Sequence, residues 1–175
     1  ITKPTTSPTV RPTRFASDII NTDLSLLQPY QGFVINGSGE NHDCLGAVSS
    51  AGDFNGDGYD DIIIGSPCFN SYNGAAYLIF GKPNGFSNIN LLSLTISQGF
   101  IIPGGGGLSG KSVSSAGDIN KDGYDDLLIG DYPTSVTIGT SYVIFGRSSG
   151  FNTPYSQSFA ISGSFPYDFA GYSVR

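Results

Sequence analysis

The chain has 175 residues with a formal net charge of −6, and 38% of them are hydrophobic. Only 13% are charged, about half the usual share, and no apolar run approaches the roughly 20 residues of a transmembrane helix. These features exclude membrane insertion. They also exclude nucleic acid as a partner, because there is no basic stripe and clustered carboxylates would repel phosphates.

Residues 1–14 form a segment rich in threonine and proline, ITKPTTSPTVRPTR. Such a composition cannot bury apolar area and favours extended polyproline conformations, so we expect an arm or linker. Two sharper interpretations are an O-glycosylated stalk and an arm that docks on a neighbouring subunit. The hydroxyl side chains that make it a glycosylation candidate are Thr2, Thr5, Thr6, Ser7, Thr9 and Thr13.

The remainder of the chain repeats itself. Val48 to Phe86 matches Val113 to Phe151 at 21 of 39 positions, and a third copy stops early. Because a single repeat of this length cannot bury both faces of its own sheet, such repeats form stacked arrays. We divide the chain into an arm, 1–14, and a repeat region, 15–175, with units 15–86, 87–151 and a partial 152–175.

Four short strands are expected in each repeat. The first lies at about 32–36, 99–102 and 158–162, and the second at about 47–52 and 112–117. The runs DIIIG and DLLIG follow the second strand, and AAYLIFG and TSYVIFG complete the repeat. β-Branched and aromatic residues, glycine punctuation and the lack of helical periodicity predict an all-β fold without helices, in which sheets stack on one another.

Eight of the fourteen carboxylates lie in two nine-residue loops, 53–61 and 118–126. Each loop has oxygen-bearing side chains at positions 1, 3, 5 and 9 and glycine at position 6, which suits Ca2+ with the position-7 carbonyl as a further ligand. The expected ligands of the two sites are Asp53, Asn55, Asp57, Tyr59 and Asp61, and Asp118, Asn120, Asp122, Tyr124 and Asp126.

Zinc sites and EF-hands fit these loops less well. Zinc would need histidine or cysteine, and an EF-hand would need a glutamate where Ile64 and Ile129 stand. A metal-free Asn/Asp/Gly turn is the remaining alternative, although four carboxylates in nine residues repel one another without a cation. Asp60 and Asp125, at position 8, should point away from the ion and are assigned no ligand role.

The two long copies, VSSAGDFNGDGYDDIIIGSP with GAAYLIFG and VSSAGDINKDGYDDLLIG with GTSYVIFG, resemble the FG-GAP repeats of integrin α-subunit β-propellers and of many microbial surface proteins. The resemblance implies four-stranded antiparallel blades, here two complete ones plus partial flanking strands. It also implies that the calcium loop joins the first and second strands. The chain departs from the family in its number of blades, and in having Asp131-Tyr132 where the first copy has Ser66-Pro67.

Three smaller motifs carry predictions of their own. Antiparallel pairing should bring Cys44 and Cys68 to one rim as a disulfide, the alternative being two buried thiols. Asn36 begins an N-x-S sequon and is an N-glycosylation candidate. The P-loop-like run GGGGLSGKS precedes a predicted strand and not a helix, so we interpret it as a turn. With His42 as the lone histidine and no paired catalytic carboxylates outside the loops, no enzyme is expected.

These observations predict an extracellular or cell-surface, calcium-binding structural or adhesion module with two Ca2+ sites. Its expected partners are other copies of itself, assembled head to tail into a filament, or neighbouring repeats of a longer chain. One alternative is a ligand-recognition fragment of an integrin-like receptor, which would meet a glycan or protein at the rim opposite the calcium loops. The other is an accessory domain of a secreted hydrolase.

Overall fold

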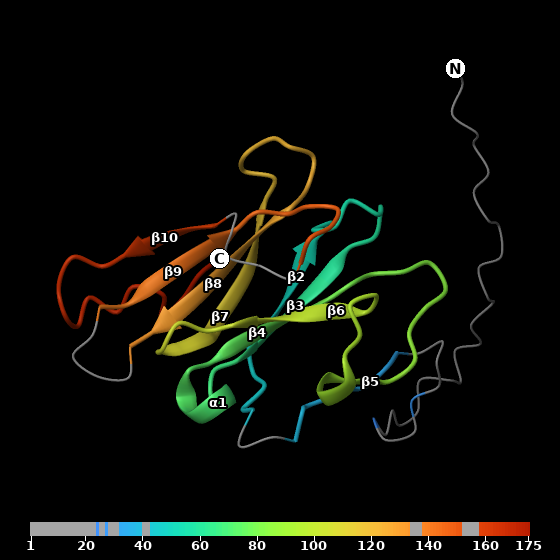
Figure 1. Ribbon diagram of the computed structural model, residues 1–175, viewed down its shortest axis with the longest axis horizontal. Helices are drawn as coiled ribbons and strands as arrows, with labels where there is room; N and C mark the ends of the chain where they lie inside the picture. The colour runs from blue at the N-terminus through green and yellow to red at the C-terminus, as the bar shows by residue number, and fades with distance from the viewer. Residues whose placement is uncertain (1–23, 25–26, 28–31, 40–42, 134–137, 152–157) are drawn as a thin grey trace, which may run out of the picture.

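Two four-stranded antiparallel sheets stand side by side in the computed structural model (Figure 1). The model describes residues 24, 27, 32–39, 43–133, 138–151 and 158–175. The arm 1–14 with its candidate glycosylation residues, and His42, lie outside these ranges. The predicted all-β class with four-stranded antiparallel sheets is confirmed.

Each sheet is a simple meander. The first sheet has the order β2-β3-β4-β6 and the second the order β7-β8-β9-β10. The strands of the first sheet are β2 (Val48–Gly52), β3 (Asp61–Ser66), β4 (Ala75–Ile79) and β6 (Gly99–Pro103). Those of the second sheet are β7 (Leu108–Gly117), β8 (Asp126–Tyr132), β9 (Thr140–Ile144) and β10 (Ser158–Ser162).

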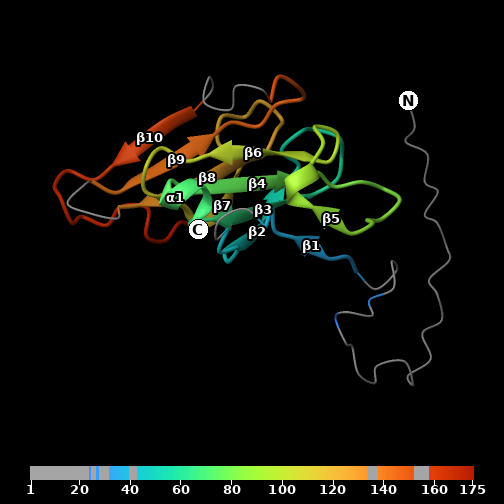
Figure 2. The same cartoon turned by 60° about the horizontal axis from the view of Figure 1, so that its bottom comes forward.

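The fourth strand of each sheet comes from the following repeat of the sequence. The predicted strand at 32–36 is seen as β1 (Ile35–Asn36), which pairs in parallel with β5 (Ile89–Asn90) beside the first sheet (Figure 2). The outer place in the first sheet is taken by β6, which pairs with β4. The two hydrogen-bonded sheets therefore span residues 48–103 and 108–162. The division of the chain at 15–86, 87–151 and 152–175 concerns the repeating unit of the sequence and stays a prediction.

Two short helical turns interrupt the strands, so the expectation of no helices was too strict. The turn α1 (Phe69–Tyr72) contains Asn70 and Ser71 with positive φ, and η2 (Leu91–Ser93) is a single 3-10 turn that begins after Asn90, whose side chain accepts the Leu92 N–H. Segments this short do not show in a periodicity search. No helix among the described residues is long and apolar enough to cross a membrane.

The main core lies between the two sheets. Alternate residues of the facing strands point into it, as the side-chain period of a strand requires. Its buried members include Ile63, Leu78 and Ile102 of the first sheet and Val113, Leu127, Ile129 and Ile144 of the second. At one end the core closes with a group of four phenylalanine rings, in which Phe100 and Phe151 stack at 4.9 Å. Burial of these side chains is the main force that holds the sheets together.

The outer face of the first sheet is also covered. Ile64, Tyr77 and Ile79 point away from the second sheet and pack beneath Ile89 and Leu91. Phe33 and Phe86 stack at 4.2 Å in the same layer. The segments around β1, β5 and η2 therefore close a second, smaller core.

A disulfide joins Cys44 and Cys68 across a separation of 24 residues, as predicted. Their Cα atoms are 5.5 Å apart, and both residues flank the β2-β3 hairpin at the end opposite the acidic loop. Closing a loop of this size restricts the unfolded chain and stabilises the fold by about 3 kcal/mol. Within the described residues there is no free cysteine.

Glycine allows the start of β7 to cross the first sheet at close range. A Cβ on Gly65 would overlap the carbonyl oxygen of Gly110. The same contact recurs one repeat later, where a Cβ on Gly130 would overlap the carbonyl oxygen of Gly171. The repeated glycine of IIIG and LLIG thus marks where a later segment of the chain lies on the sheet, β7 in the first copy and a turn in the second.

We therefore expect Gly65→Ala to destabilise the protein by about 2 kcal/mol, because the added methyl group meets backbone that cannot rotate away. Urea unfolding followed by circular dichroism measures the change. Gly46→Ala is the matched control, since its nearest neighbour, the Cys44 carbonyl oxygen, would lie at 3.6 Å. Equal stability of the two variants would show that the crossing is not tight.

Candidate metal-binding loops

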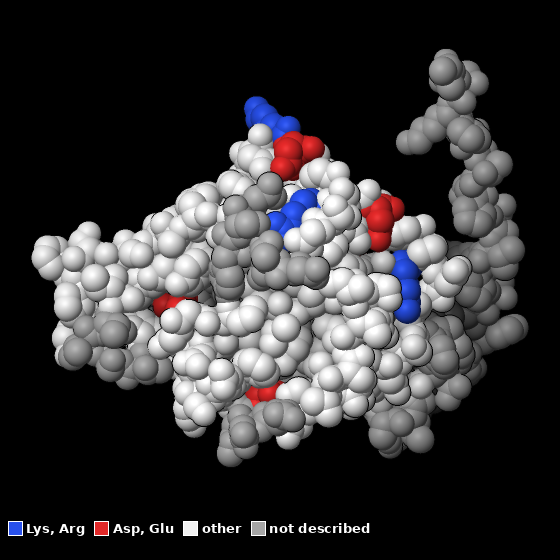
Figure 3. All heavy atoms as spheres, in the orientation of Figure 1, with Lys and Arg blue, Asp and Glu red and all other residues white. Residues whose placement is uncertain are grey.

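The two acidic loops occupy the same edge of the molecule. One joins β2 to β3 and the other joins β7 to β8, so each forms the tip of the first hairpin of its sheet. Figure 3 shows acidic side chains, in red, at this upper edge. This placement, between the first and second strands of a sheet, is the one that the resemblance to FG-GAP repeats implies.

Inside each loop the oxygen atoms are turned toward the loop's own backbone. In the first loop the Asp57 N–H donates to Asp53 Oδ1 and to Asn55 Oδ1, both at 2.9 Å. The Gly58 N–H donates to Asp53 Oδ2 at 2.9 Å, and the Tyr59 N–H donates to Asp57 Oδ1 at 3.0 Å. Positions 1, 3 and 5 are therefore brought around one small region of backbone.

The second loop repeats this scheme bond for bond. The Asp122 N–H donates to Asp118 Oδ1 at 3.1 Å and to Asn120 Oδ1 at 3.0 Å. Gly123 and Tyr124 donate to Asp118 Oδ2 at 2.9 Å and to Asp122 Oδ1 at 3.0 Å. Gly58 and Gly123, at position 6, have φ of 89° and 94°, values that a residue with a side chain rarely adopts. Two separate sequences thus fold into the same loop.

The carboxylates at position 9 are buried and tie each loop to the rest of its sheet. Asp61 is 1% exposed and accepts the Phe54 N–H at 3.1 Å and the Gly81 N–H at 2.7 Å. Asp126 is fully buried and accepts from Ile119 and Gly146 at 3.0 and 2.9 Å. Each position-9 side chain therefore joins the start of its loop to the segment that follows the third strand.

Burial makes these two carboxyl groups weaker acids. The pKa of Asp61 is raised from 3.8 to about 6. Desolvation is the main cause and the negative charges of Asp57 and Asp53 add to it, while the two backbone hydrogen bonds act in the opposite direction. Desolvation raises the pKa of Asp126 in the same direction, with Asp122 and Asp118 adding to it. A cation near these groups would favour their ionised forms.

The donor set of each loop suits a hard divalent cation: three carboxylates, one amide oxygen and a backbone carbonyl, with no nitrogen or sulfur ligand. No three acidic, histidine or cysteine side chains among the described residues are gathered as they would be around a bound ion. In this arrangement the loop carboxylates accept backbone N–H groups. Residues of the right kind are thus brought near one another, and their coordination of an ion stays a prediction.

One functional contact was missed by the sequence interpretation. Asp125, at position 8, is directed at the other loop, where it accepts the Asp53 N–H at 2.8 Å. Its counterpart Asp60 is exposed. Because both copies carry Asp at this position, no signal in the sequence distinguishes the two roles.

The remaining candidate residues lie away from the loops. Asn36 is the last residue of β1 and is exposed. Only the first four residues of the run GGGGLSGKS, 104–107, precede β7, and the other five belong to the strand, so the expected turn is shorter than the motif. Asp131 stands at the opposite end of β8 and is 8% exposed, with an Oδ1 atom that has no hydrogen-bond partner among the described residues.

Comparison with known proteins agrees with this geometry. The FG-GAP repeat family matches residues 45–79 and 109–144, which include both loops. The chain is 30% identical to integrin alpha-6 of Homo sapiens over 126 residues, 70% of this chain and 10% of that protein. It is 40% identical to integrin alpha pat-2 of Caenorhabditis elegans over 89 residues, 51% of this chain and 6% of that protein. The chain thus spans about a tenth or less of these relatives.

The raised pKa of Asp61 predicts a pH dependence of stability in cation-free protein. Its folded pKa of about 6 exceeds the ordinary 3.8, so its contribution to stability is fully present below about pH 3.8 and lost as the pH rises through 6. We expect the melting temperature in EDTA to rise as the pH is lowered from 7 to 5. In Asp61→Asn this slope should be reduced, and a slope equal to that of the wild type would contradict the assignment.

Proposed function

The chain is built from FG-GAP repeats of the integrin α type, and we propose that it is an extracellular structural or adhesion module whose two acidic loops each bind one Ca2+. The observation that carries the proposal is the identical hydrogen-bonded scheme of the two loops. It turns two carboxylates and an amide oxygen, those of positions 1, 3 and 5, toward one stretch of backbone, and it does so in both loops at one edge of the molecule. Repetition of a costly arrangement of like charges argues for a bound cation.

The residues we propose as ligands are those of positions 1, 3, 5, 7 and 9 in each loop. Calcium would neutralise the charge that the loops concentrate and hold the first hairpin of each sheet. Its role here is structural, and we propose no catalytic one. The unit of this module is taken to be the sequence repeat, 15–86 and 87–151, followed by the partial copy 152–175.

An extracellular location is supported by the Cys44–Cys68 disulfide, because such bonds persist mainly in oxidising compartments. Use of Asn36 as a glycosylation site is compatible with its exposure. The relatives that the chain matches are integrin α subunits, which favours a surface receptor or adhesion protein as the context of the module.

Head-to-tail assembly into a filament stays a prediction, and the structure bears on it at one point. The outer face of the first sheet is covered by β1, β5 and η2, so it does not offer the bare apolar layer that joins the two sheets to each other. Copies of this chain would have to join by other contacts. Neighbouring repeats of a longer chain are therefore the partners that we favour.

Ligand recognition is a second candidate function, and one observation favours it. At the edge opposite the acidic loops, Gly105, Gly106 and Gly107 line a hollow together with Asp131 and Ile138. The buried Asp131 carboxylate accepts from the Ser109 side chain, and desolvation raises its pKa. Its Oδ1 has no hydrogen-bond partner among the described residues but is buried against Gly107, so a donor group of a protein or glycan would have to displace this glycine to reach it.

The calcium proposal is tested by thermal unfolding and isothermal calorimetry. We expect two sites, and a rise in stability of about 3 kcal/mol per site at a hundredfold excess of Ca2+ over Kd. Asp53→Ala and Asp118→Ala should each remove one site, whereas Asp60→Ala should keep both. A melting temperature that is the same in EDTA and in millimolar Ca2+ would refute the proposal.

The recognition candidate is tested on glycan and peptide arrays. A ligand of this edge should bind the wild type and lose at least about tenfold in affinity in Asp131→Ala, since a buried charged hydrogen bond is lost. Asp60→Ala, at the other edge, is the control. Blank arrays, or a ligand equally retained by Asp131→Ala, would remove this candidate.

A further inference from the structure

The two acidic loops contact each other through a reciprocal pair of hydrogen bonds. The Asp53 N–H donates to Asp125 Oδ2 at 2.8 Å, and the Asp125 N–H donates to the Asp53 carbonyl oxygen at 3.2 Å. Asp53 is the first of the nine residues of its loop, and Asp125 is the eighth of the nine residues of the other. Residues 72 positions apart in sequence are therefore held together at the edge where both loops lie.

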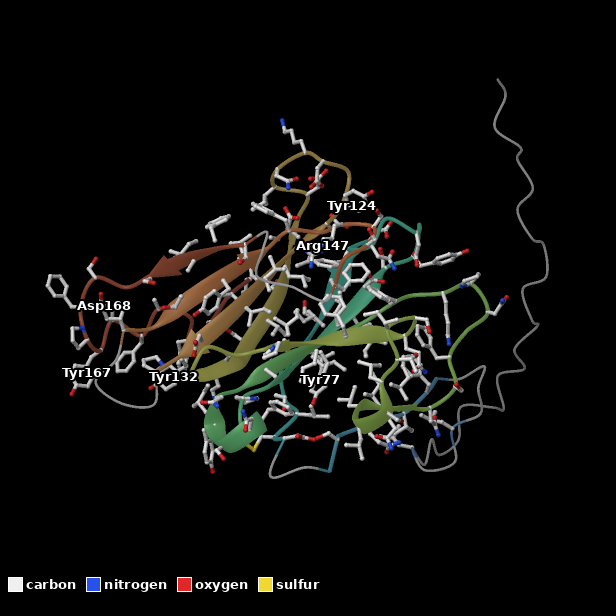
Figure 4. All side chains as sticks on the ribbon, viewed as in Figure 1. Tyr77, Tyr124, Tyr132, Arg147, Tyr167 and Asp168 are labelled. Carbon is white, nitrogen blue, oxygen red and sulfur yellow. A yellow bond between two sulfur atoms is a disulfide. The ribbon has the colours of Figure 1, made fainter. Side chains whose placement is uncertain are left out.

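Two further contacts hold the first loop against the second repeat. The Tyr124 ring lies over Gly56, where a Cβ would overlap the ring, and the Arg147 N–H donates to the Phe54 carbonyl oxygen at 2.9 Å. Figure 4 shows Tyr124 and Arg147 next to each other at the upper edge. Three points of the first loop's backbone, at positions 1, 2 and 4, are thus braced by the second repeat.

Asp125 is placed between two proposed ligands of its own loop, the Tyr124 carbonyl and the Asp126 carboxylate. An ion that fixes these two neighbours also fixes the backbone of Asp125. The Asp125 carboxylate then holds the backbone of Asp53, the first ligand residue of the other loop. We propose that Asp125 is a positioning residue that couples the two loops, so that calcium in the second loop tightens binding in the first. This inference rests on the calcium function proposed above.

The chain contains a natural control for this role. Asp60 holds position 8 of the first loop, is exposed, and accepts no hydrogen bond from the described residues. The place on the second loop that corresponds to Gly52 is Gly117, which has the same φ of 64°. The Asp125 carboxylate packs against Gly52, whereas no atom of the described residues lies within 4 Å of a Cβ placed on Gly117. Of the two aspartates at position 8, only Asp125 therefore contacts the other loop.

A purely electrostatic role for Asp125 is the competing hypothesis, and it can be separated from positioning. A carboxylate near the first loop would attract a cation through its charge alone. Asp125→Asn removes the charge and keeps an oxygen that accepts the Asp53 N–H, whereas Asp125→Ala removes both. The positioning role predicts that the asparagine variant keeps most of the affinity that the alanine variant loses.

The experiment is a calcium titration of the isotopically labelled chain followed by NMR, with the amides of Gly58 and Gly123 as reporters of the first and second loop. In Asp125→Ala we expect the Kd reported by Gly58 to rise roughly fivefold or more, the lower end of typical coupling between sites. The same substitution at Asp60 should leave the Kd reported by each glycine unchanged. Asp125→Asn should stay within about twofold of the wild type for Gly58.

A double-mutant cycle completes the test. Asp118→Ala removes a proposed ligand of the second loop and, because calcium then no longer fixes that loop, should also weaken the first loop by a similar factor. In the Asp125→Ala background, Asp118→Ala should have no further effect on the Kd reported by Gly58. Additive effects of the two substitutions on that Kd would overturn the coupling.

The outcomes are distinct from those that bear on calcium binding itself. If neither glycine amide responds to Ca2+ in the wild type, both the calcium function and this inference fail. If both respond, but Asp125→Ala leaves the Gly58 titration unchanged or weakens it no more than Asp125→Asn does, only the positioning role fails. Melting temperatures of the cation-free variants show whether Asp125→Ala is folded, and Asp125→Asn keeps the test valid if it is not.

Discussion

The apolar layer between the two sheets is the constraint on which the rest of the structure depends. Side chains such as Leu78 and Leu127 are fully buried in it, and they set how closely the sheets approach. That approach requires glycine where β7 crosses the first sheet, because backbone meets backbone at Gly65 and Gly110. It also brings the two hairpin tips to the same edge. The position of the acidic loops is therefore a consequence of core packing.

The core reaches the first loop directly through Phe54. This side chain is 1% exposed and lies 6.1 Å from Phe100 and 6.2 Å from Phe151, ring centre to ring centre. Its counterpart in the second loop, Ile119, is 49% exposed. The same nine-residue scheme is thus anchored by burial in one loop and left open to solvent in the other. The residue at this position differs between the loops, and only Phe54 has aromatic rings of the following repeat against it.

Buried carboxylates at position 9 connect stability with charge. Asp61 and Asp126 each accept two backbone N–H groups, which satisfies their oxygens but does not replace the solvation of an ionised group. Their raised pKa values show that ionisation carries a cost in the absence of a cation. A divalent ion would reduce that cost at the point where each loop is tied to its sheet. Structural stability and cation binding are therefore properties of the same few side chains.

Much of this protein could be predicted from local sequence. The period of repetition, the alternation of strands, the disulfide partners and the loop positions all follow from residue types and spacing, because strands, turns and hairpins are governed by near neighbours. Three features depended on contacts between distant residues. The first is that β6 and β10 complete the sheet of the preceding repeat. The second is the parallel pairing of β1 with β5. The third is that Asp125 contacts the other loop whereas Asp60 does not. Asp125 and Asp60 occupy the same position of matching motifs, but only Asp125 has another loop packed against it. Tertiary packing alone decides which of the two has that neighbour.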